Sequence, residues 1–313
     1  MTSKAPRRRP SGARAAATRI ALVIKRSQWR VQLEEKKDGR LARLVDANDA
    51  SVAALRAAHE QHERTVAEVR DALEAVGAEV AFVKRAGETF DSRGLDLVVT
   101  VGGDGTLLAA SHSVDSVPVL GVNSAPRHSV GFFCGVKSGH VLAAVERAVR
   151  GELRPTVLTR MKVCVNGQVV AARVLNDAHL CHASPAATSR YVIELDGEIE
   201  KQKSSGFWIG PAAGSTAAQR SAGGRVLPLS SPNLQLVVRE PYAPHGESYA
   251  ILRRLVKPGE TLVVRSKMHD AKLFFDGPDA SFDVGYADLI EFTSAAPSLT
   301  VLGLTSKRKW GAT

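Results

Sequence analysis

One stretch of the chain places a single carboxylate among glycines. Residues 97–111 read LVVTVGGDGTLLAAS, in which a β-branched run breaks at Gly102 and an alanine- and leucine-rich run follows Gly105. This pattern predicts a buried strand, a tight turn and the start of a helix. Glycines let the backbone approach a bulky anion, and the first N–H groups of a helix have no internal partner. We therefore predict a phosphate-binding loop in which Asp104 can deprotonate a hydroxyl or hold a metal.

The loop differs from two common nucleotide-binding fingerprints. No Gly-Lys-Ser/Thr closes it, and its glycine spacing is not that of GxGxxG. The plain structural alternative is a strand-to-helix turn in which Asp104 only caps the helix. The loop alone therefore does not identify a nucleotide site, and the other polar positions of the chain have to be considered together with Asp104.

Three further segments carry polar or small residues at the ends of apolar runs. Asn123 ends the run before NSAPRHSVGFF, and Asn176 with Asp177 follows the run 169–175. An adjacent amide and carboxylate could hydrogen-bond the two hydroxyls of a ribose. Residues 211–224, PAAGSTAAQRSAGG, are small enough for close approach of a ligand to the backbone. Read separately, each could also be an ordinary turn, loop or linker.

The elements that must position these residues alternate between strand and helix in the first half. A long amphipathic helix is predicted from Asp49 to Gly77, after a charged, partly helical segment at 26–43. Alternating strands and helices require a parallel sheet covered by helices, and such sheets bind ligands at the carboxyl ends of their strands, where Asp104 falls. The predicted buried strands are 18–25, 79–84, 97–101 and 117–122.

The second half of the chain has a different sequence pattern, in which short runs typical of β-strands replace the alternation of strands and helices. A helix predicted at 141–149 stops at Gly151, and short alternating runs then follow, separated by Asn-Gly and Asp-Gly pairs at 166–167, 196–197 and 276–277. We therefore predict an α/β N-terminal domain with a parallel sheet, plus a mainly antiparallel β second domain. The predicted divisions are a disordered basic tail at 1–17, an α/β nucleotide-binding domain at 18–150, a β-rich domain at 151–284, and C-terminal strands at 285–313. Periodicity does not decide whether those last strands return to the first domain.

Composition narrows the class of protein. The chain has 313 residues, 44% of them hydrophobic, and no apolar run of the roughly 18 to 20 residues that crosses a bilayer. Its three cysteines lack CxxC pairing, so neither a disulfide framework nor a zinc site is predicted, and Cys181 with His179 and His182 is interpreted as structural. We expect a cytoplasmic protein without a metal site of its own and without a membrane partner.

Charge is concentrated at the N-terminus. The formal net charge is +10, yet residues 1–19 contain six Lys or Arg and no acid. The rest is therefore only mildly basic, which favours small polyanionic substrates over nucleic acid. An arginine-rich, acid-free start is also typical of organelle targeting, which stays as the alternative localisation.

Taken in order, four motifs resemble those of the NAD kinase family. They are VGGDGTLL, LGVNS with GFF, LND, and GSTAAQRSAGG, and the resemblance covers about residues 18–305. VIKRSQWR, DGEIEKQKSSG and VVREP are similar to the mitochondrial-type branch and its bacterial relatives. The five letters GGDGT alone are also shared with lipid kinases, so the selective feature is the order of the four motifs.

The resemblance implies a phosphoryl transfer from ATP, or from polyphosphate, to the 2′-hydroxyl of the adenosine ribose of NAD, giving NADP. It implies Asp104 as the catalytic base, residues 151–284 as the NAD-binding domain, Mg²⁺ or another divalent cation with ATP, and a homodimer or homotetramer. The nucleotide-binding residues that it implies are Gly102, Gly103, Gly105, Thr106, Asn123, Asn176, Asp177, Lys203, Ser205, Thr216, Ala217 and Ser221.

The chain departs from the family pattern at a few positions. Ser205 stands where the commoner branch has an Asp, and Ala218 and Gln219 replace Tyr-Ser. These differences leave the choice between NAD and NADH open. Two alternatives remain at this stage: a diacylglycerol-type lipid kinase, and a nucleotide-binding regulator of the same fold that has lost catalysis.

Overall fold

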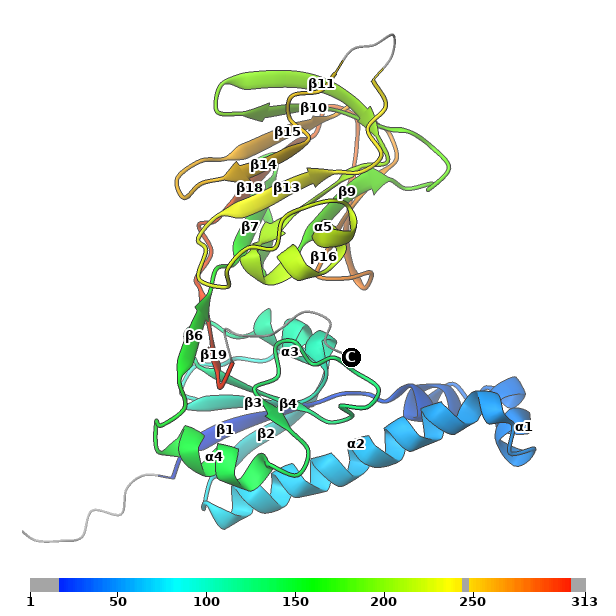
Figure 1. Cartoon of the computed structure of the whole chain (residues 1–313), viewed down its shortest axis with the longest axis vertical. Coiled ribbons are helices and arrows are strands. Elements are labelled where there is room, and N and C mark those ends of the chain that lie inside the picture. The colour runs from blue at the N-terminus through cyan, green and yellow to red at the C-terminus, as the bar shows by residue number, and fades with distance from the viewer. Residues whose placement is uncertain (1–16, 244–247, 305–313) are drawn as a thin grey trace, which may run out of the picture.

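The computed structural model describes residues 17–243 and 248–304, arranged as two domains one above the other (Figure 1). The lower domain is built on one seven-stranded sheet with the order β2-β1-β3-β4-β19-β6, to which β5 adds beside β4. Its strands are β1 (Arg19–Ile24), β2 (Glu79–Arg85), β3 (Leu97–Gly102), β4 (Val119–Asn123), β5 (Val136–Lys137), β6 (Pro155–Leu158) and β19 (Leu299–Leu302). Strand β6 alone runs antiparallel to its neighbour, so the sheet is essentially parallel as predicted.

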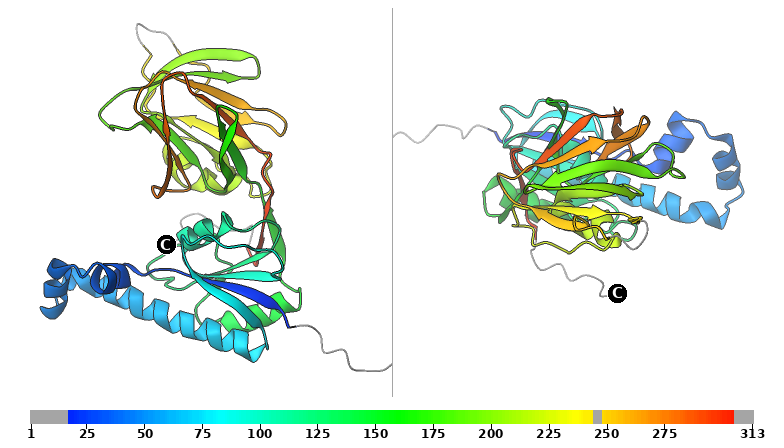
Figure 2. Two further views of the ribbon diagram at one scale, coloured as in Figure 1. Left: turned by 180° about the vertical axis from the view of Figure 1, so that it is seen from behind. Right: turned by 90° about the horizontal axis from the view of Figure 1, so that it is seen from above.

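Helices cover both faces of this sheet because its strands are apolar on both sides. On one face, Ile20 and Leu22 pack with Val69 of α2 (Ala50–Ala75) and Val145 of α4 (Val141–Val149). On the other face, α3 (Asp104–Ser111) packs against the alternate residues of β1. The predicted charged segment forms the short helices η1 (Arg30–Glu35) and α1 (Gly39–Asp46), which project with the start of α2 beyond the sheet (Figures 1 and 2).

The upper domain consists of two packed six-stranded sheets. One has the order β11-β10-β15-β18-β7-β8 and the other β14-β13-β12-β9-β16-β17. Their inward side chains form a single core that includes Tyr191, Phe207 and Phe292. The bounds are β7 (Met161–Val165), β8 (Gln168–Val174), β9 (Ala178–His182), β10 (Ser189–Leu195), β11 (Glu198–Ser204), β12 (Phe207–Pro211), β13 (Leu234–Val238), β14 (Arg253–Val256), β15 (Leu262–Ser266), β16 (Ala271–Phe275), β17 (Ala280–Val284) and β18 (Leu289–Thr293). Two short helices, η2 (Ala212–Thr216) and α5 (Ala218–Ser221), follow β12.

The three predicted hairpins are confirmed. Asn166, Asp196 and Asp276 have φ values of 50°, 53° and 51°, and the glycine after each is also left-handed. Two successive positive φ angles are what a type I′ turn requires, and they fit the two-residue loops at 166–167 and 196–197, whereas Asp276 and Gly277 begin a four-residue loop. The turns join β7 to β8, β10 to β11, and β16 to β17.

The chain crosses between the domains twice, and this corrects one predicted boundary. Residues 151–158 were assigned to the second domain, yet β6 pairs with β19 in the first sheet. Strand β19 also pairs with β4, so the last described strand completes the first sheet, whereas β18 stays in the second domain. The sequence missed this because β6 is as short and as alternating as the strands that follow it. The predicted tail at 1–17 and the last residues of 285–313 lie almost wholly outside the described residues.

Arg160 sits where these crossings meet. Its side chain is fully buried and donates to the carbonyls of Ser111 and Val114 after α3 and of Pro297 before β19. Burial lowers its pKa to about 10, so the guanidinium stays charged at neutral pH. The arginine thus ties α3 to both interdomain segments. Within the described residues no helix combines the length and apolarity needed to span a membrane.

Candidate functional site

The glycines of the GGDG turn have different surroundings. A methyl group on Gly102 would overlap the side chain of Thr106, and one on Gly103 would lie 2.6 Å from Ser129 Oγ. A methyl group on Gly105 would meet nothing within 4 Å. The first two glycines are therefore required by packing within the chain itself, and only Gly105 leaves the backbone open to an approaching ligand.

Asp104 is the first residue of α3, and its carboxylate is held by the loop that follows β4. Oδ2 accepts the backbone N–H of Phe132 at 2.8 Å, and Oδ1 accepts that of Phe133 at 2.7 Å. The residue is half-buried. Both oxygens are therefore fixed in direction, while partial exposure leaves room for a further donor such as a hydroxyl. A negative charge in the first turn is also favourably placed with respect to the helix dipole.

Two predicted ligand-binding side chains near Asp104 are buried. Asn123 is 1% exposed, donates to the carbonyl of Ser129 and accepts from the N–H of Ala125. Thr106 is 4% exposed and packs against Gly102. In the structure both side chains shape the walls of the glycine loop, and direct contact with a nucleotide stays a prediction for them.

Asn176 and Asp177 lie between β8 and β9, against the segment that begins η2. A methyl group on Gly214 would overlap the carbonyl oxygen of Asn176, and one on Gly210 would lie 2.8 Å from Asp177 Cα. The structure therefore brings the predicted ribose-binding pair into direct contact with the start of the predicted dinucleotide segment. The absence of side chains at positions 210 and 214 is what permits this approach.

Asp276, which the sequence marked only as a turn residue, shapes the same loop. Its side chain is 3% exposed and accepts the backbone N–H groups of Leu175, Asn176 and Asp177 at 2.9, 2.6 and 3.1 Å. Burial, together with the charge of Asp276, raises the pKa of Asp177 to about 7. The Asn176 side-chain amide donates to Asp177 Oδ2 at 3.0 Å.

The two halves of the predicted site meet across the domain boundary. Leu107, one turn after Asp104, belongs to the same hydrophobic cluster as Leu175 and Ala213. Leu175 precedes Asn176 and Ala213 precedes Gly214, so one continuous apolar cluster includes residues of α3 and residues next to both upper-domain segments. Figure 1 shows α3 on the side of the lower domain that faces the upper one.

Lys203 and Ser205 are not brought to this region. In the register of β12 with β9, Ile209 pairs with Ala178 and Phe207 with Leu180. Ser205 therefore lies toward the His182 end of β9, whereas Asp177 precedes the opposite end. A site that used Ser205 and Asp177 together would have to span the length of these strands or draw on a second molecule.

Thr216 ends η2, Ala217 joins it to α5, and Ser221 ends α5, where a cavity opens beside it. It measures about 510 Å³ and is lined by Ser221, Trp208 and Arg239, among others. Trp208 stacks on His179 with ring centroids 4.1 Å apart, and burial lowers the pKa of His179 to about 4. The cavity therefore offers an aromatic edge and a cation next to the predicted dinucleotide segment.

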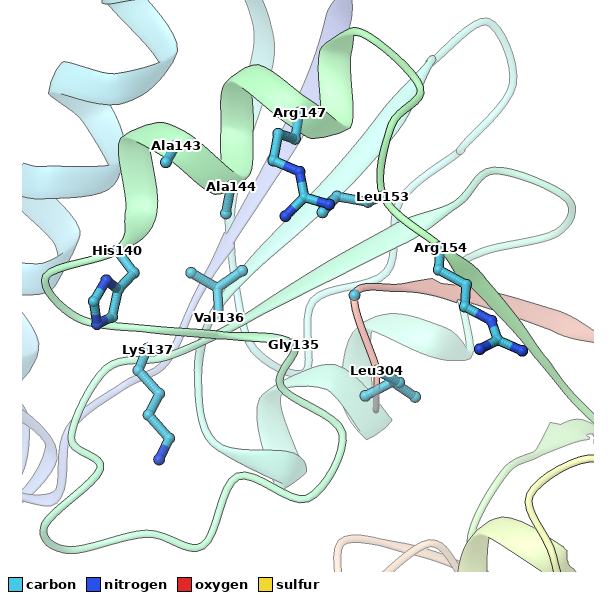
Figure 3. Close-up of a pocket in the computed structure, with 11 residues that line it drawn as sticks. Gly135, Val136, Lys137, His140, Ala143, Ala144, Arg147, Leu153, Arg154 and Leu304 are labelled. Carbon is cyan, nitrogen blue, oxygen red and sulfur yellow. The ribbon is translucent and has the colours of Figure 1, made fainter. Parts of the chain in front are cut away.

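A larger cavity of about 760 Å³ lies between α4, β5 and the end of β19 (Figure 3). Four of its lining residues are basic: Lys137, His140, Arg147 and Arg154. Lys137 and Arg147 point to opposite sides of β5 in the figure. None of the predicted site residues lines this cavity, so size alone does not locate the site.

The described residues contain no group of three or more His, Cys, Asp or Glu side chains arranged to hold a metal ion. Among the described residues, Cys134, Cys164 and Cys181 form no disulfide. Cys181 and His182 are adjacent on β9, where successive side chains point to opposite faces.

Sequence reasoning missed three residues that organise the site. Arg160 and Arg173 gave no signal, because an isolated arginine in a β-rich segment is usually a surface charge. For Asp276, the sequence predicted only a place in an Asp-Gly turn and no role in the site. His112 lies close to the glycine loop in the sequence, and in the structure its Nε2 donates to Asp276 at 2.7 Å.

Comparisons with known proteins agree with this arrangement. Residues 11–153 match the family model of the ATP-NAD kinase N-terminal domain. The probable NADH kinase of Oryza sativa subsp. japonica is 35% identical over 230 residues, which are 66% of this chain and 71% of that protein. The NADH kinase of Arabidopsis thaliana is 35% identical over 232 residues, 67% of this chain and 73% of that protein.

Two crystal structures share the fold over most of the chain. An NAD kinase from Archaeoglobus fulgidus in complex with ATP has a TM-score of 0.61 at 18% identity and covers 93% of this chain and 94% of its own. Yeast NADH kinase complexed with NADH has a TM-score of 0.64 at 15% identity and covers 93% of this chain and 85% of its own. By sequence and by fold, the chain belongs to the NAD kinase family.

Proposed function

We propose that this chain transfers the terminal phosphoryl group of ATP to the 2′-hydroxyl of the adenosine ribose of NAD, giving NADP. The observation that carries the proposal is the hydrogen bond from His112, at the end of the helix that begins with Asp104, to Asp276, which holds the Asn176–Asp177 loop. Family membership supports the substrates. Phosphoryl transfer is helped by a general base near the accepting hydroxyl and by hydrogen-bond donors around the phosphates, the roles that we assign to Asp104 and to the backbone of the glycine loop.

Asp104 accepts the proton of the ribose hydroxyl as the oxygen attacks the γ-phosphorus of ATP, and the bond from that phosphorus to the bridging oxygen breaks to release ADP. The Phe132 and Phe133 N–H groups hold its carboxylate in one direction, so little reorganisation is needed when the proton moves. Asn176 and Asp177 orient the ribose, and Gly105 leaves space for phosphate oxygens at the start of α3. Positioning of this kind supplies much of the rate enhancement in phosphoryl transfer.

We propose that a divalent cation, Mg²⁺ in the usual case, enters with ATP. Mg²⁺ commonly binds through substrate phosphates with one or two protein carboxylates, so a dedicated protein cluster is not required. Asp104 is the acid of the glycine loop that could contribute one ligand. When bound, the cation neutralises charge on the phosphate oxygens.

The proposal also covers the redox state of the acceptor and the identity of the phosphoryl donor. The accepting hydroxyl is on the adenosine ribose, so the chemistry does not require a particular redox state of the nicotinamide, and we propose that both NAD and NADH are phosphorylated. The relatives named above are described as NADH kinases, and a protein from Chlorobium limicola that is 33% identical over 178 residues is described as an NAD kinase. Polyphosphate is the second candidate donor, because the same backbone N–H groups would meet its terminal phosphates.

We also propose that the protein acts as a homodimer or homotetramer in the cytoplasm. Lys203 and Ser205 lie at the far end of β9 and β12 from Asp177, so their use at one site would require a second copy. Co-expression of a chain carrying Asp104→Asn with one carrying Lys203→Ala tests this: shared sites restore activity, and independent sites do not.

The experiment that tests the function is a coupled assay for NADP. Purified protein is incubated with ATP or polyphosphate, Mg²⁺, and NAD or NADH, and the product is measured enzymatically. NADP or NADPH formation supports the proposal. Binding of NAD without turnover would instead support an inactive regulator, and phosphorylation of diacylglycerol would support a lipid kinase.

A further inference from the structure

The carboxylate of Asp276 is engaged by two domains at once. In the upper domain it accepts three consecutive backbone N–H groups, from Leu175, Asn176 and Asp177. From the lower domain it accepts the Nε2–H of His112 at 2.7 Å. A side chain that is 3% exposed and has four donors has no freedom to reorient.

His112 is held at the C-terminal end of the helix that starts with Asp104. It is the C-cap residue of α3, and its carbonyl oxygen accepts from Arg173 of the upper domain at 2.9 Å. Ring and backbone of the same residue are therefore bound to the upper domain. Since α3 is a short rigid rod, movement of His112 would move Asp104 with it.

We propose that His112 and Asp276 are positioning residues that set the distance and angle between Asp104 and the Asn176–Asp177 loop. Neither residue touches the reacting atoms in this scheme. The proposal rests on the proposed function, because it assigns Asp104 to the proton and the loop to the ribose. Loss of the pair would let α3 and the loop move apart by a fraction of an ångström to an ångström, a range in which rates of oriented reactions fall steeply.

A purely structural role predicts a different result. Arg160 and Arg173 also bind the C-terminal end of α3, through the carbonyls of Ser111, Val114 and His112. The His112 side chain is 35% exposed, so its removal leaves no large cavity. The fold should therefore survive loss of the imidazole, while the alignment of the two catalytic halves should not.

The test compares His112→Leu, His112→Gln and a control, His269→Leu, at an exposed histidine in the upper domain. Steady-state kinetics with ATP and NAD should show kcat of His112→Leu about 10- to 100-fold lower with KM changed less than about threefold, since binding groups are intact. His112→Gln keeps an N–H donor and should recover kcat to within about threefold of the wild type, and the control should match the wild type.

Several outcomes would overturn the inference. They are unchanged kcat in folded His112→Leu, equal losses in the Leu and Gln variants, or a loss that appears in KM alone. Thermal midpoints are measured for every variant. If His112→Leu does not fold, His112→Gln is compared with Asp276→Asn, in which one carboxylate oxygen is replaced by a donor. The inference then requires that kcat falls in Asp276→Asn and not in His112→Gln. A wild type that makes no NADP would refute the proposed function itself, a result distinct from all of these.

Discussion

Replacing Asp177 with Asn should change the pH dependence of stability. Burial and the nearby Asp276 charge raise the pKa of Asp177 from 3.8 to about 7 in the folded protein. The folded state therefore keeps a proton that the unfolded state has released between these two values, and the free energy of unfolding falls as pH rises through this window. A difference of about three pH units corresponds to about 4 kcal/mol, of which about 2 kcal/mol is lost between pH 5 and pH 7.

The assay is urea unfolding followed by circular dichroism at several values between pH 5 and pH 8.5. Asp177→Asn has no carboxylate to ionise, so its stability relative to the wild type should rise by about 2 kcal/mol from pH 5 to pH 7 and level off above about pH 8. Asp279→Asn, at an exposed position, is the matched control and should run parallel to the wild type. A difference between Asp177→Asn and wild type that is constant with pH would refute the reasoning, because it would mean that Asp177 is ionised throughout.

Four further substitutions test the packing of the site. Gly102→Ala should destabilise the fold by about 1–3 kcal/mol because its methyl group would overlap Thr106, whereas Gly105→Ala should leave stability within about 0.5 kcal/mol, and thermal unfolding compares the two. Gly214→Ala should displace the Asn176 carbonyl and weaken NAD binding at least tenfold by calorimetry; unchanged affinity would show that the loop is free to shift. Arg160→Leu should leave several buried carbonyls without donors and cost about 3–5 kcal/mol in urea unfolding, and a loss below 1 kcal/mol would contradict its role as the interdomain tie.

Much of the fold could be predicted because its signals are local. The strand before Gly102, the helix that ends at Gly77 and the three Asn-Gly or Asp-Gly hairpins each follow from neighbouring residues. The return of β19 to the first sheet could not be predicted, since Leu299–Leu302 would fit either sheet. Pairing between strands that are far apart in the sequence depends on the packing of the whole domain, so the residues of one short strand do not indicate its partner.

The site divides in the same way. Asp104, Asn176 and Asp177 were identified from polar residues at the ends of apolar runs, helped by a family resemblance. The contacts that hold them were not, because Asp276 bonds to backbone N–H groups about a hundred residues earlier in the chain, and any residue type could have supplied those groups. The role of Arg160 could not be predicted for a similar reason, because all its hydrogen-bond partners are backbone carbonyls, which every residue type has.

The most direct test of the account is NADP formation by the wild type and by Asp104→Asn, with NAD binding measured in parallel. Asparagine keeps the shape of the side chain but cannot take the proton, so turnover should fall on the order of a hundredfold or more while NAD still binds. An Asp104→Asn variant that turns over at near the wild-type rate would contradict the assignment of the carboxylate at the start of α3 as the base.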